Sequence, residues 1–302
     1  MTRRWLGVLV AAGCLLTGCG TTSPAAERPA AAPSSSRPTH SRPATAAPSA
    51  IPTPTPSSSP PTLARPPAGT VPPTWLGTRV LPRTAGGFGR IKPTPTVLRN
   101  RRFTLPDPVG ELPGSGFASR VEIAPPRVIA RSTWKPGCPV AAADLAWVRL
   151  TFWGFDSRRH TGELLVNKRV SGRLVTVFHR LYDDRYPIEE MRITRKDELD
   201  APPTGDGNDT GAFNCRPVVG QKVFSQHAYG LAIDVNPFQN PYLKGDLVLP
   251  ELASAYADRS WTRPGMILPG DQVVRAFASI GWEWGGSWHS LKDLQHFSAE
   301  GG

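Results

Sequence analysis

The segment "SQHAYGLAIDVNP" (residues 225–237) places an imidazole and a carboxylate at a spacing that suits metal chemistry. His227 stands seven residues before Asp234, and Gly230 lies between them. An apolar run, 231–233, leads directly into the aspartate. A carboxylate in that position either caps or turns the chain, or it meets a positive charge at the end of a strand.

A second segment, "GWEWGGSWHSLKDLQHFS" (281–298), supplies Asp293 three residues before His296. Two imidazoles and one carboxylate form a familiar zinc set that leaves the fourth position open for water. A further carboxylate beside that water can accept its proton. Together, the two segments predict His227, Asp234 and His296 as zinc ligands and Asp293 as the general base.

The seven-residue spacing of His227 and Asp234 also constrains where each residue can lie. Successive side chains of a strand point to opposite faces, so two residues seven apart on one strand cannot share a face. If Asp234 ends a strand, His227 must therefore lie in the loop before it. Gly230 is then expected to let the chain turn between the two ligands.

Other polar residues near these segments have weaker claims. Glu283 and His289 lie in the second segment as an alternative base and an alternative substrate group. His160 and His179 have no metal-ligand spacing to each other, and we expect His179 on the surface of a helix. The segment "DGNDTGAFN" (206–214) has the composition of a calcium loop but lacks its regular spacing and closing glutamate, so we expect a loop beside the cleft.

The elements that must position these residues mix helices and short strands without a regular alternation, which indicates an α+β domain. β-Branched and aromatic residues predict strands, and apolar residues at helical spacing predict a helix. An aspartate N-cap and a glycine stop predict a second helix. The expected strands cover 145–155, 162–166 and 186–193, and the expected helices cover 170–184 and 272–280, the second between Asp271 and Gly281.

The N-terminal part of the chain has the composition of an export signal followed by a linker. Residues 1–18 combine two arginines with an apolar stretch too short to be a stable membrane span. The stretch ends in "LTGC", which resembles a bacterial lipobox and predicts lipidation of Cys19; an ordinary cleaved signal is the alternative. Residues 19–120, rich in Pro, Ala and Ser, predict a largely disordered tether, so we expect the folded domain to cover 121–302.

Charge divides the chain at about the same place. The sequence has 35 Lys and Arg against 24 Asp and Glu, a formal net charge of +11. Residues 20–102 hold eleven basic residues and one acid, Glu27, whereas the chain from Phe103 onward holds 22 basic and 23 acidic residues. Because an exported lipoprotein rarely meets nucleic acid, we expect anionic lipid headgroups or wall polymers as partners of the tether. A tether without a partner is the alternative.

The cysteines are consistent with export. Cys14 lies in the signal and Cys19 is the predicted lipid site, so Cys138 and Cys215 remain for the folded domain. Two thiols outside the cytoplasm readily pair, and neither has the CxxC spacing of a zinc site. We predict a Cys138–Cys215 disulfide, with two separate buried thiols as the alternative.

Both metal segments are similar to a known signature. "SQHAYGLAIDVNP" resembles the SxHxxGxAxD motif of the M15 zinc peptidases, which include D-Ala-D-Ala carboxypeptidases and L-Ala-D-Glu endolysins. "WGGSWHSLKDLQHF" resembles their closing DxxH segment. The resemblance implies Zn²⁺ held by His227, Asp234 and His296 on the sheet-and-helix fold of the D-Ala-D-Ala carboxypeptidases and hedgehog-like domains. Asp293, the implied base, stands where the carboxypeptidases have glutamate, which favours the endolysin-like subgroup of the family.

The resemblance also implies two residues on the substrate side. Ser225 matches the serine two positions before the first ligand, and Arg216 matches an upstream arginine that holds substrate or stabilises an oxyanion; a structural salt bridge is the alternative for Arg216. The implied protein is a zinc peptidase, lipid-anchored on the outer face of the cytoplasmic membrane, that hydrolyses peptidoglycan stem peptides. The alternatives are a non-catalytic wall-binding lipoprotein of the same fold and a zinc enzyme that cuts the amide between sugar and peptide.

Overall fold

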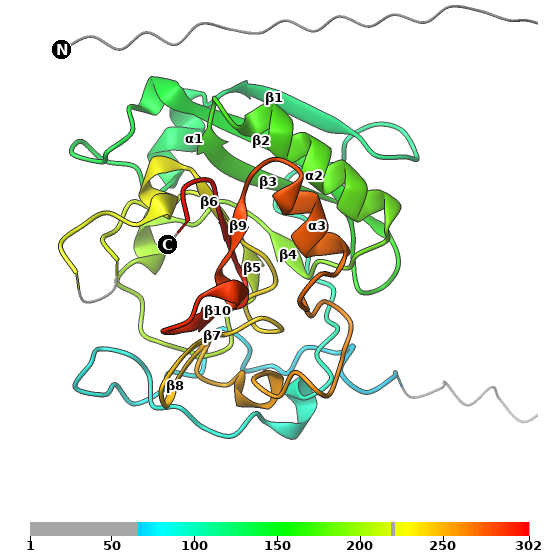
Figure 1. Cartoon of the computed structure of the whole chain (residues 1–302). Coiled ribbons are helices and arrows are strands. Elements are labelled where there is room, and N and C mark those ends of the chain that lie inside the picture. The colour runs from blue at the N-terminus through cyan, green and yellow to red at the C-terminus, as the bar shows by residue number, and fades with distance from the viewer. Residues whose placement is uncertain (1–65, 219–220, 302) are drawn as a thin grey trace, which may run out of the picture. The chain divides into compact units, whose positions relative to one another are not determined.

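A long antiparallel hairpin is the scaffold of the fold in this computed structural model (Figure 1). Strand β2 (Leu145–Trp153) pairs with β3 (Arg159–Asn167) along its whole length, and β1 (Ser119–Ile123) pairs with the other edge of β2. Side chains alternate along β2, so one set packs in the main core and the other in a second cluster. The strands expected at 145–155 and 162–166 are confirmed, and β3 extends beyond the expected range at both ends.

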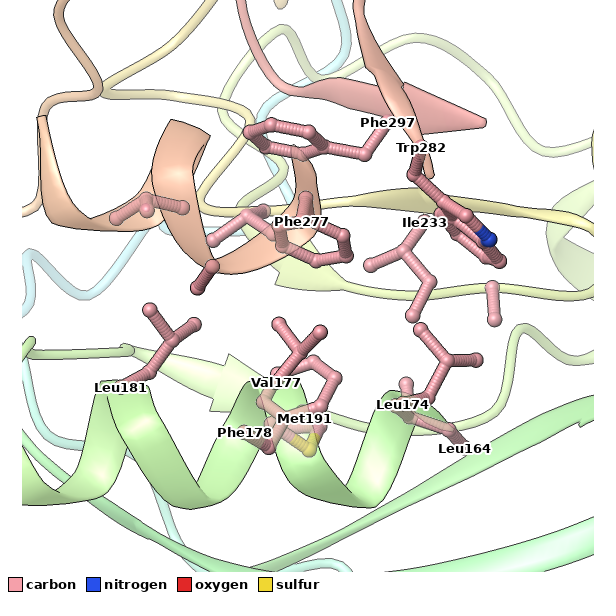
Figure 2. Close-up of a cluster of buried hydrophobic side chains, with 14 of the residues drawn as sticks. Leu164, Leu174, Val177, Phe178, Leu181, Met191, Ile233, Phe277, Trp282 and Phe297 are labelled. Atoms are coloured by element: carbon pink, nitrogen blue, oxygen red, sulfur yellow. The ribbon is translucent and has the colours of Figure 1, made fainter. Parts of the chain in front are cut away.

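Helix α2 (Ser171–Asp183) packs over the hairpin and against helix α3 (Gln272–Ala278) (Figure 1). Figure 2 shows the core between them, where Val177 of α2 and Phe277 of α3 lie among the side chains of the main core. The apolar residues of α2 recur at helical spacing, as the sequence predicts. The buried positions of the helix include Leu174, Val177, Phe178 and Leu181.

Both ends of α3 follow from local chemistry. The Asp271 side chain accepts a hydrogen bond from the Val274 N–H at 3.0 Å, which satisfies one of the free donors of the first turn. Gly281 follows the helix with φ of 80°, a left-handed conformation that glycine adopts without steric cost. The predicted N-cap and stop are therefore confirmed. A shorter helix, α1 (Pro126–Arg131), contributes Val128 to the second cluster.

The other strands are short and lie together on the side of the molecule that carries the metal segments. They are β4 (Glu190–Met191), β5 (Asp209–Thr210), β6 (Ala232–Asp234), β7 (Tyr242–Lys244), β8 (Leu247–Leu249), β9 (Glu283–Trp284), β10 (Lys292–Asp293) and β11 (His296–Ser298). Their pairings give the orders β6-β11-β9 and β10-β7-β8 and a parallel β4-β5 pair. The α+β class is confirmed, although the strand expected at 186–193 is reduced to β4.

Residues 66–103, called the strap from here on, are irregular but packed. They follow the opposite side of the molecule from α2 (Figure 1). Leu81, Leu98 and Phe103 are each at most 2% exposed and lie in a third apolar cluster with Tyr256. The expected tether boundary at 120 is wrong for this part of the chain, because these apolar residues are buried on the domain. They stand at irregular intervals among prolines and glycines, so they give no periodic signal.

A buried ion pair also fixes the strap. Arg101 donates two hydrogen bonds to Glu189, at 2.6 and 2.8 Å, and both side chains are almost completely buried. Asn208 donates a further bond to Glu189, and Arg101 donates one to the carbonyl of Asp206. Beyond the strap, Asp107 accepts the N–H of Thr161 on β3, so the chain before 121 stays in contact with the domain.

The structure describes residues 66–218 and 221–301. Within these ranges no helix has the length and apolar character needed to cross a membrane. The predicted signal peptide 1–18, the predicted lipidation site Cys19 and the first part of the predicted tether lie outside the described residues.

Candidate metal centre

The pairing of β6 with β11 brings two predicted ligands side by side. Asp234 and His296 stand directly opposite each other in the antiparallel register. Their neighbours Ile233 and Phe297 also form a pair, and both are fully buried in the main core. Because side chains alternate along a strand, Asp234 and His296 share the other face, at the distance of a cross-strand pair.

His227 reaches the same point from a turn of 3₁₀-helix, Gln226–Tyr229. The Ser225 hydroxyl caps this turn by accepting the His227 N–H at 3.3 Å. Gly230 ends it with φ of 67°, and a Cβ there would lie 2.5 Å from the Asn167 nitrogen. His227 therefore lies before the strand that ends in Asp234, as the spacing predicts, and only glycine fits at the turn.

The ligand atoms converge. His227 Nε2 lies 3.2 Å from His296 Nδ1 and 3.3 Å from Asp234 Oδ2, and His296 Nδ1 lies 3.2 Å from Asp234 Oδ1. His227 Nδ1 lies 2.6 Å from the Ala212 carbonyl, which can only accept, so this nitrogen carries the proton. The lone pair of His227 Nε2 therefore points at the other two ligands.

The electrostatics of this cluster favour a cation at its centre. Burial alone would raise the pKa of Asp234, but the positive charge that His227 and His296 carry when protonated, with their hydrogen bonds, outweighs burial and lowers the pKa below its ordinary range. Burial alone would lower the pKa of His296, but Asp234 and then Asp293 raise it. Two ring nitrogens and a carboxylate that stabilise positive charge at one point fit a metal ion of the zinc type.

Asp293 lies on the neighbouring strand β10, opposite Tyr242 of β7. Burial, and then the charge of Asp234, raise the pKa of Asp293 to about 6. Gln295 donates a hydrogen bond to its carboxylate at 3.2 Å. The main chain at Gly285 lies against Asp293 and His296, and only glycine fits there. A Cβ at this position would lie 2.6 Å from the Asp293 carbonyl oxygen and 3.3 Å from the Cβ of His296. Asp293 is thus a half-buried carboxyl whose pKa suits proton exchange near neutral pH.

The remaining predicted site residues differ in their relation to the cluster. The half-buried Arg216 is close enough for its charge to oppose protonation of His296, and it donates to the Pro217 carbonyl rather than to an acid. Glu283 and His289 are exposed. Glu283 lies beside Gly301 near the end of the chain. The structure therefore supports Asp293 over Glu283 as the carboxyl nearest the ligands.

Two aromatic residues lie beside the predicted site residues. The Trp288 ring lies 5.3 Å from the His296 ring and forms a wall beside it. Burial, and then the charge of Asp293, raise the pKa of Tyr242. Tyr242 comes 51 residues before Asp293 and outside both motifs, so only the β7–β10 pairing reveals it.

Other candidates lie elsewhere. His160 is held between Asp107 at 2.7 Å and Asp156 at 3.1 Å, one at each ring nitrogen, so its partners do not converge on a single point. His179 is exposed on α2 and stacks on Phe117. Among the described residues, the His227–Asp234–His296 group alone places three such ligand atoms within 4.8 Å of one another.

A disulfide adjoins the site. Cys138 and Cys215 are joined, with their Cα atoms 5.9 Å apart. The Cys215 N–H donates to Thr133, and the next residue is Arg216. The Asn214 N–H donates to the carbonyl of His227. The disulfide therefore links the segment that carries Arg216 to the chain just before β2.

Two imidazoles and one carboxylate around a point, with a half-buried carboxyl of raised pKa nearby, make up a candidate site for one metal ion. Residues 219–299 match the peptidase M15 family model described as D-alanyl-D-alanine carboxypeptidase. The predicted relation to the M15 peptidases is thereby confirmed over this segment, which contains all three ligands and Asp293. No curated protein and no solved structure gives a match to the chain.

Proposed function

We propose that this protein is a zinc-dependent peptidase that hydrolyses peptide bonds in peptidoglycan stem peptides. One observation carries the proposal: His227, Asp234 and His296 converge on one point within a segment that matches an M15 peptidase model. Asp293 lies close enough to be affected by their charges. A protein that only binds wall peptides has no need of a half-buried carboxyl with a pKa suited to proton exchange.

Zinc suits this donor set better than a hard cation does. Calcium and magnesium prefer oxygen ligands, whereas zinc accepts imidazole nitrogens together with one carboxylate. Zinc at this point would act as a Lewis acid on water and on the scissile carbonyl. The bond from His227 Nδ1 to the Ala212 carbonyl fixes the ring with Nε2 toward the site, as the outer hydrogen bonds of metal-binding histidines do.

The chain's own groups then handle the proton and the developing charge. With a pKa of about 6, Asp293 is mostly ionised at neutral pH and still basic enough to accept a proton from the attacking water. It can return that proton to the leaving amine. Arg216 supplies a fixed positive charge where the carbonyl oxygen becomes negative. Ser225 orients the turn that carries His227.

The bond that is cut is identified by mass spectrometry of muropeptides digested with the purified protein. Loss of one terminal D-alanine indicates a D,D-carboxypeptidase. A peptide divided after its first residue indicates the endolysin-like L,D-endopeptidase that Asp293 favours. Release of the intact stem peptide from the sugar supports the amidase alternative instead.

We also propose that the protein is exported and lipid-anchored on the outer face of the cytoplasmic membrane. The support is the sequence of residues 1–18 and the lipobox-like "LTGC" that ends at Cys19. Cys19→Ala should abolish incorporation of a labelled fatty acid and move the protein from the membrane fraction to the medium. Labelling that survives the substitution would overturn the anchor.

The variant Asp293→Asn tests the peptidase proposal. The amide keeps the size of the side chain but cannot accept a proton. The variant should fold, retain zinc and bind stem peptide, while hydrolysis falls by about 10²–10⁴-fold, the usual contribution of a general base. Zinc content, peptide binding and turnover are measured on the same preparation.

His296→Ala is the matched contrast, because it removes a ligand instead of the base. It should lose zinc and some stability together with activity. Parental turnover in Asp293→Asn would exclude Asp293 as the base. If the parent holds no stoichiometric zinc and added zinc restores nothing, the metallopeptidase proposal fails; binding of muropeptides without any cleavage would favour the receptor alternative.

A further inference from the structure

The strap concentrates positive charge on a folded surface. Its 38 residues, 66–103, contain seven Lys and Arg and no Asp or Glu. Arg101 is paired with Glu189, but the other six have no carboxylate within 4 Å in the part of the chain that the structure describes. These six are Arg79, Arg83, Arg90, Lys92, Arg99 and Arg102. The charge excess of the chain is therefore partly held on the domain and open to a ligand.

Main-chain hydrogen bonds fix the chain that carries these cations. The Lys92 N–H donates to the carbonyl of Glu251, and the Arg102 N–H donates to that of Gly69. The Arg90 N–H donates to the carbonyl of Pro82. A ligand that binds cations on such a folded segment loses less conformational entropy than one that must first order a disordered basic arm.

One end of the strap forms a hollow of about 290 Å³. Its lining includes Arg101, Arg102 and Arg263 together with Trp261, and none of the lining residues is acidic. Trp261 is 43% exposed, although large aromatic side chains are usually covered. The Arg263 guanidinium lies 3.7 Å from the centre of the indole ring and covers one face of it. The hollow thus combines positive charge with an accessible aromatic surface.

Of the three arginines in the hollow, only Arg102 keeps donors that the protein does not use. Arg263 is buried between the rings of Trp261 and Tyr256 and donates to the carbonyls of Arg99, Ala255 and Trp261, so it adds unpaired positive charge under the hollow but no accessible donor. Arg102 makes one side-chain bond, to the carbonyl of Ala68 at 3.3 Å. Guanidinium groups bind phosphate and other oxyanions through paired hydrogen bonds, and an exposed indole offers a flat face to a ring.

We propose that the strap and the Trp261 hollow form a second binding site, separate from the metal centre, for an anionic glycopolymer. The oxyanions of the polymer lie along the strap cations, and one sugar ring enters the hollow against Trp261. A concave site fits a polymer unit, whereas a planar bilayer contacts only its rim. This site would hold the domain on wall polymer while the metal centre acts on a neighbouring peptide.

The proposal is tested on the full chain with fluorescein-labelled dextran sulfate, followed by fluorescence anisotropy. Unlabelled dextran sulfate, dextran and poly-glutamate serve as competitors. Dextran has sugar and no charge, and poly-glutamate has charge and no sugar. Arg102→Gln should weaken binding by about tenfold, the loss expected for one charged hydrogen bond, and Trp261→Ala should weaken it by up to about tenfold through loss of the ring face. Poly-glutamate should compete less well than unlabelled dextran sulfate, and raising the salt should weaken binding.

Arg173→Gln, an exposed arginine on α2, is the matched control for charge. It should change binding less than twofold, and all three variants should keep parental melting temperatures and parental turnover of a small soluble muropeptide. An equal loss in Arg173→Gln would reduce the site to general attraction by net charge and overturn the proposal. Tighter binding to phosphatidylglycerol vesicles than to dextran sulfate, with the same dependence on Arg102 and Trp261, would assign the surface to membrane and also overturn it.

Discussion

The candidate metal centre and the strap are both made of short or irregular chain, but different forces hold them. At the metal centre, main-chain pairing of β6 with β11 and a glycine turn place the side chains. The strap has almost no regular pairing and is held by scattered side chains, chiefly Leu98, Phe103 and the Arg101–Glu189 pair. Local geometry leaves a signature in the sequence, whereas long-range packing of irregular chain does not. Each of the following predictions tests one side of this contrast.

The largest effect on stability is expected from the ion pair of the strap. Arg101→Met leaves Glu189 buried without its cation, so the free energy of unfolding should fall by about 3–5 kcal/mol. The measurement is urea denaturation followed by circular dichroism. In the double variant Arg101→Met/Glu189→Met no unpaired charge remains, and its loss should be smaller than the sum of the two single losses. A change below about 1 kcal/mol for Arg101→Met would mean that the strap does not belong to the folded core.

The apolar contacts of the strap are tested with two adjacent residues. Leu98 is fully buried, whereas Val97 is 45% exposed. Leu98→Ala should reduce the free energy of unfolding by about 2–5 kcal/mol, and Val97→Ala by no more than about 0.5 kcal/mol. Thermal melts of both variants give the comparison. Equal and small losses would restore the interpretation of this region as a tether.

At the candidate metal centre, Gly230→Ala should lower the free energy of unfolding by about 2 kcal/mol and weaken zinc binding. A left-handed conformation costs a residue with a Cβ about 1–2 kcal/mol, and the new methyl group would also press on the main chain of Asn167. Gly245→Ala is the control, since Gly245 has φ of 54° but open space around it. If both variants lose the same stability and keep the same zinc affinity, the close approach to Asn167 is irrelevant to the site.

The smallest effect is expected from the cap of the His227 turn. Ser225→Ala removes the acceptor of the His227 N–H and should lower the free energy of unfolding by about 1 kcal/mol. Zinc should stay bound, because none of the three ligands is changed. Loss of stoichiometric zinc in this variant would show that Ser225 does more than orient the turn.

The sequence predicted the site better than the extent of the fold. The convergence of His227, Asp234 and His296, the turn at Gly230 and the caps of α3 follow from residue types at fixed short spacings. The Asp234–His296 contact spans 62 residues, yet the motifs imply it because one ion needs both side chains. No ligand requires Leu98 to be buried, so no motif predicts its burial. The position of Tyr242 beside Asp293 follows only from the two-residue pairing of β7 with β10.

The position of the strap in the chain has a consequence for the order of folding. Arg101 bonds to Glu189, 88 residues later, and to the hydroxyl of Tyr256, 155 residues later, while Thr94 bonds to the carbonyl of Leu252 after 158. A chain made from its N-terminus therefore presents the strap long before its partners exist. Its seven like charges, with no acid among them, repel one another and keep this stretch extended during that interval. The same charges that line its surface in the finished protein thus delay premature collapse of the unfinished one.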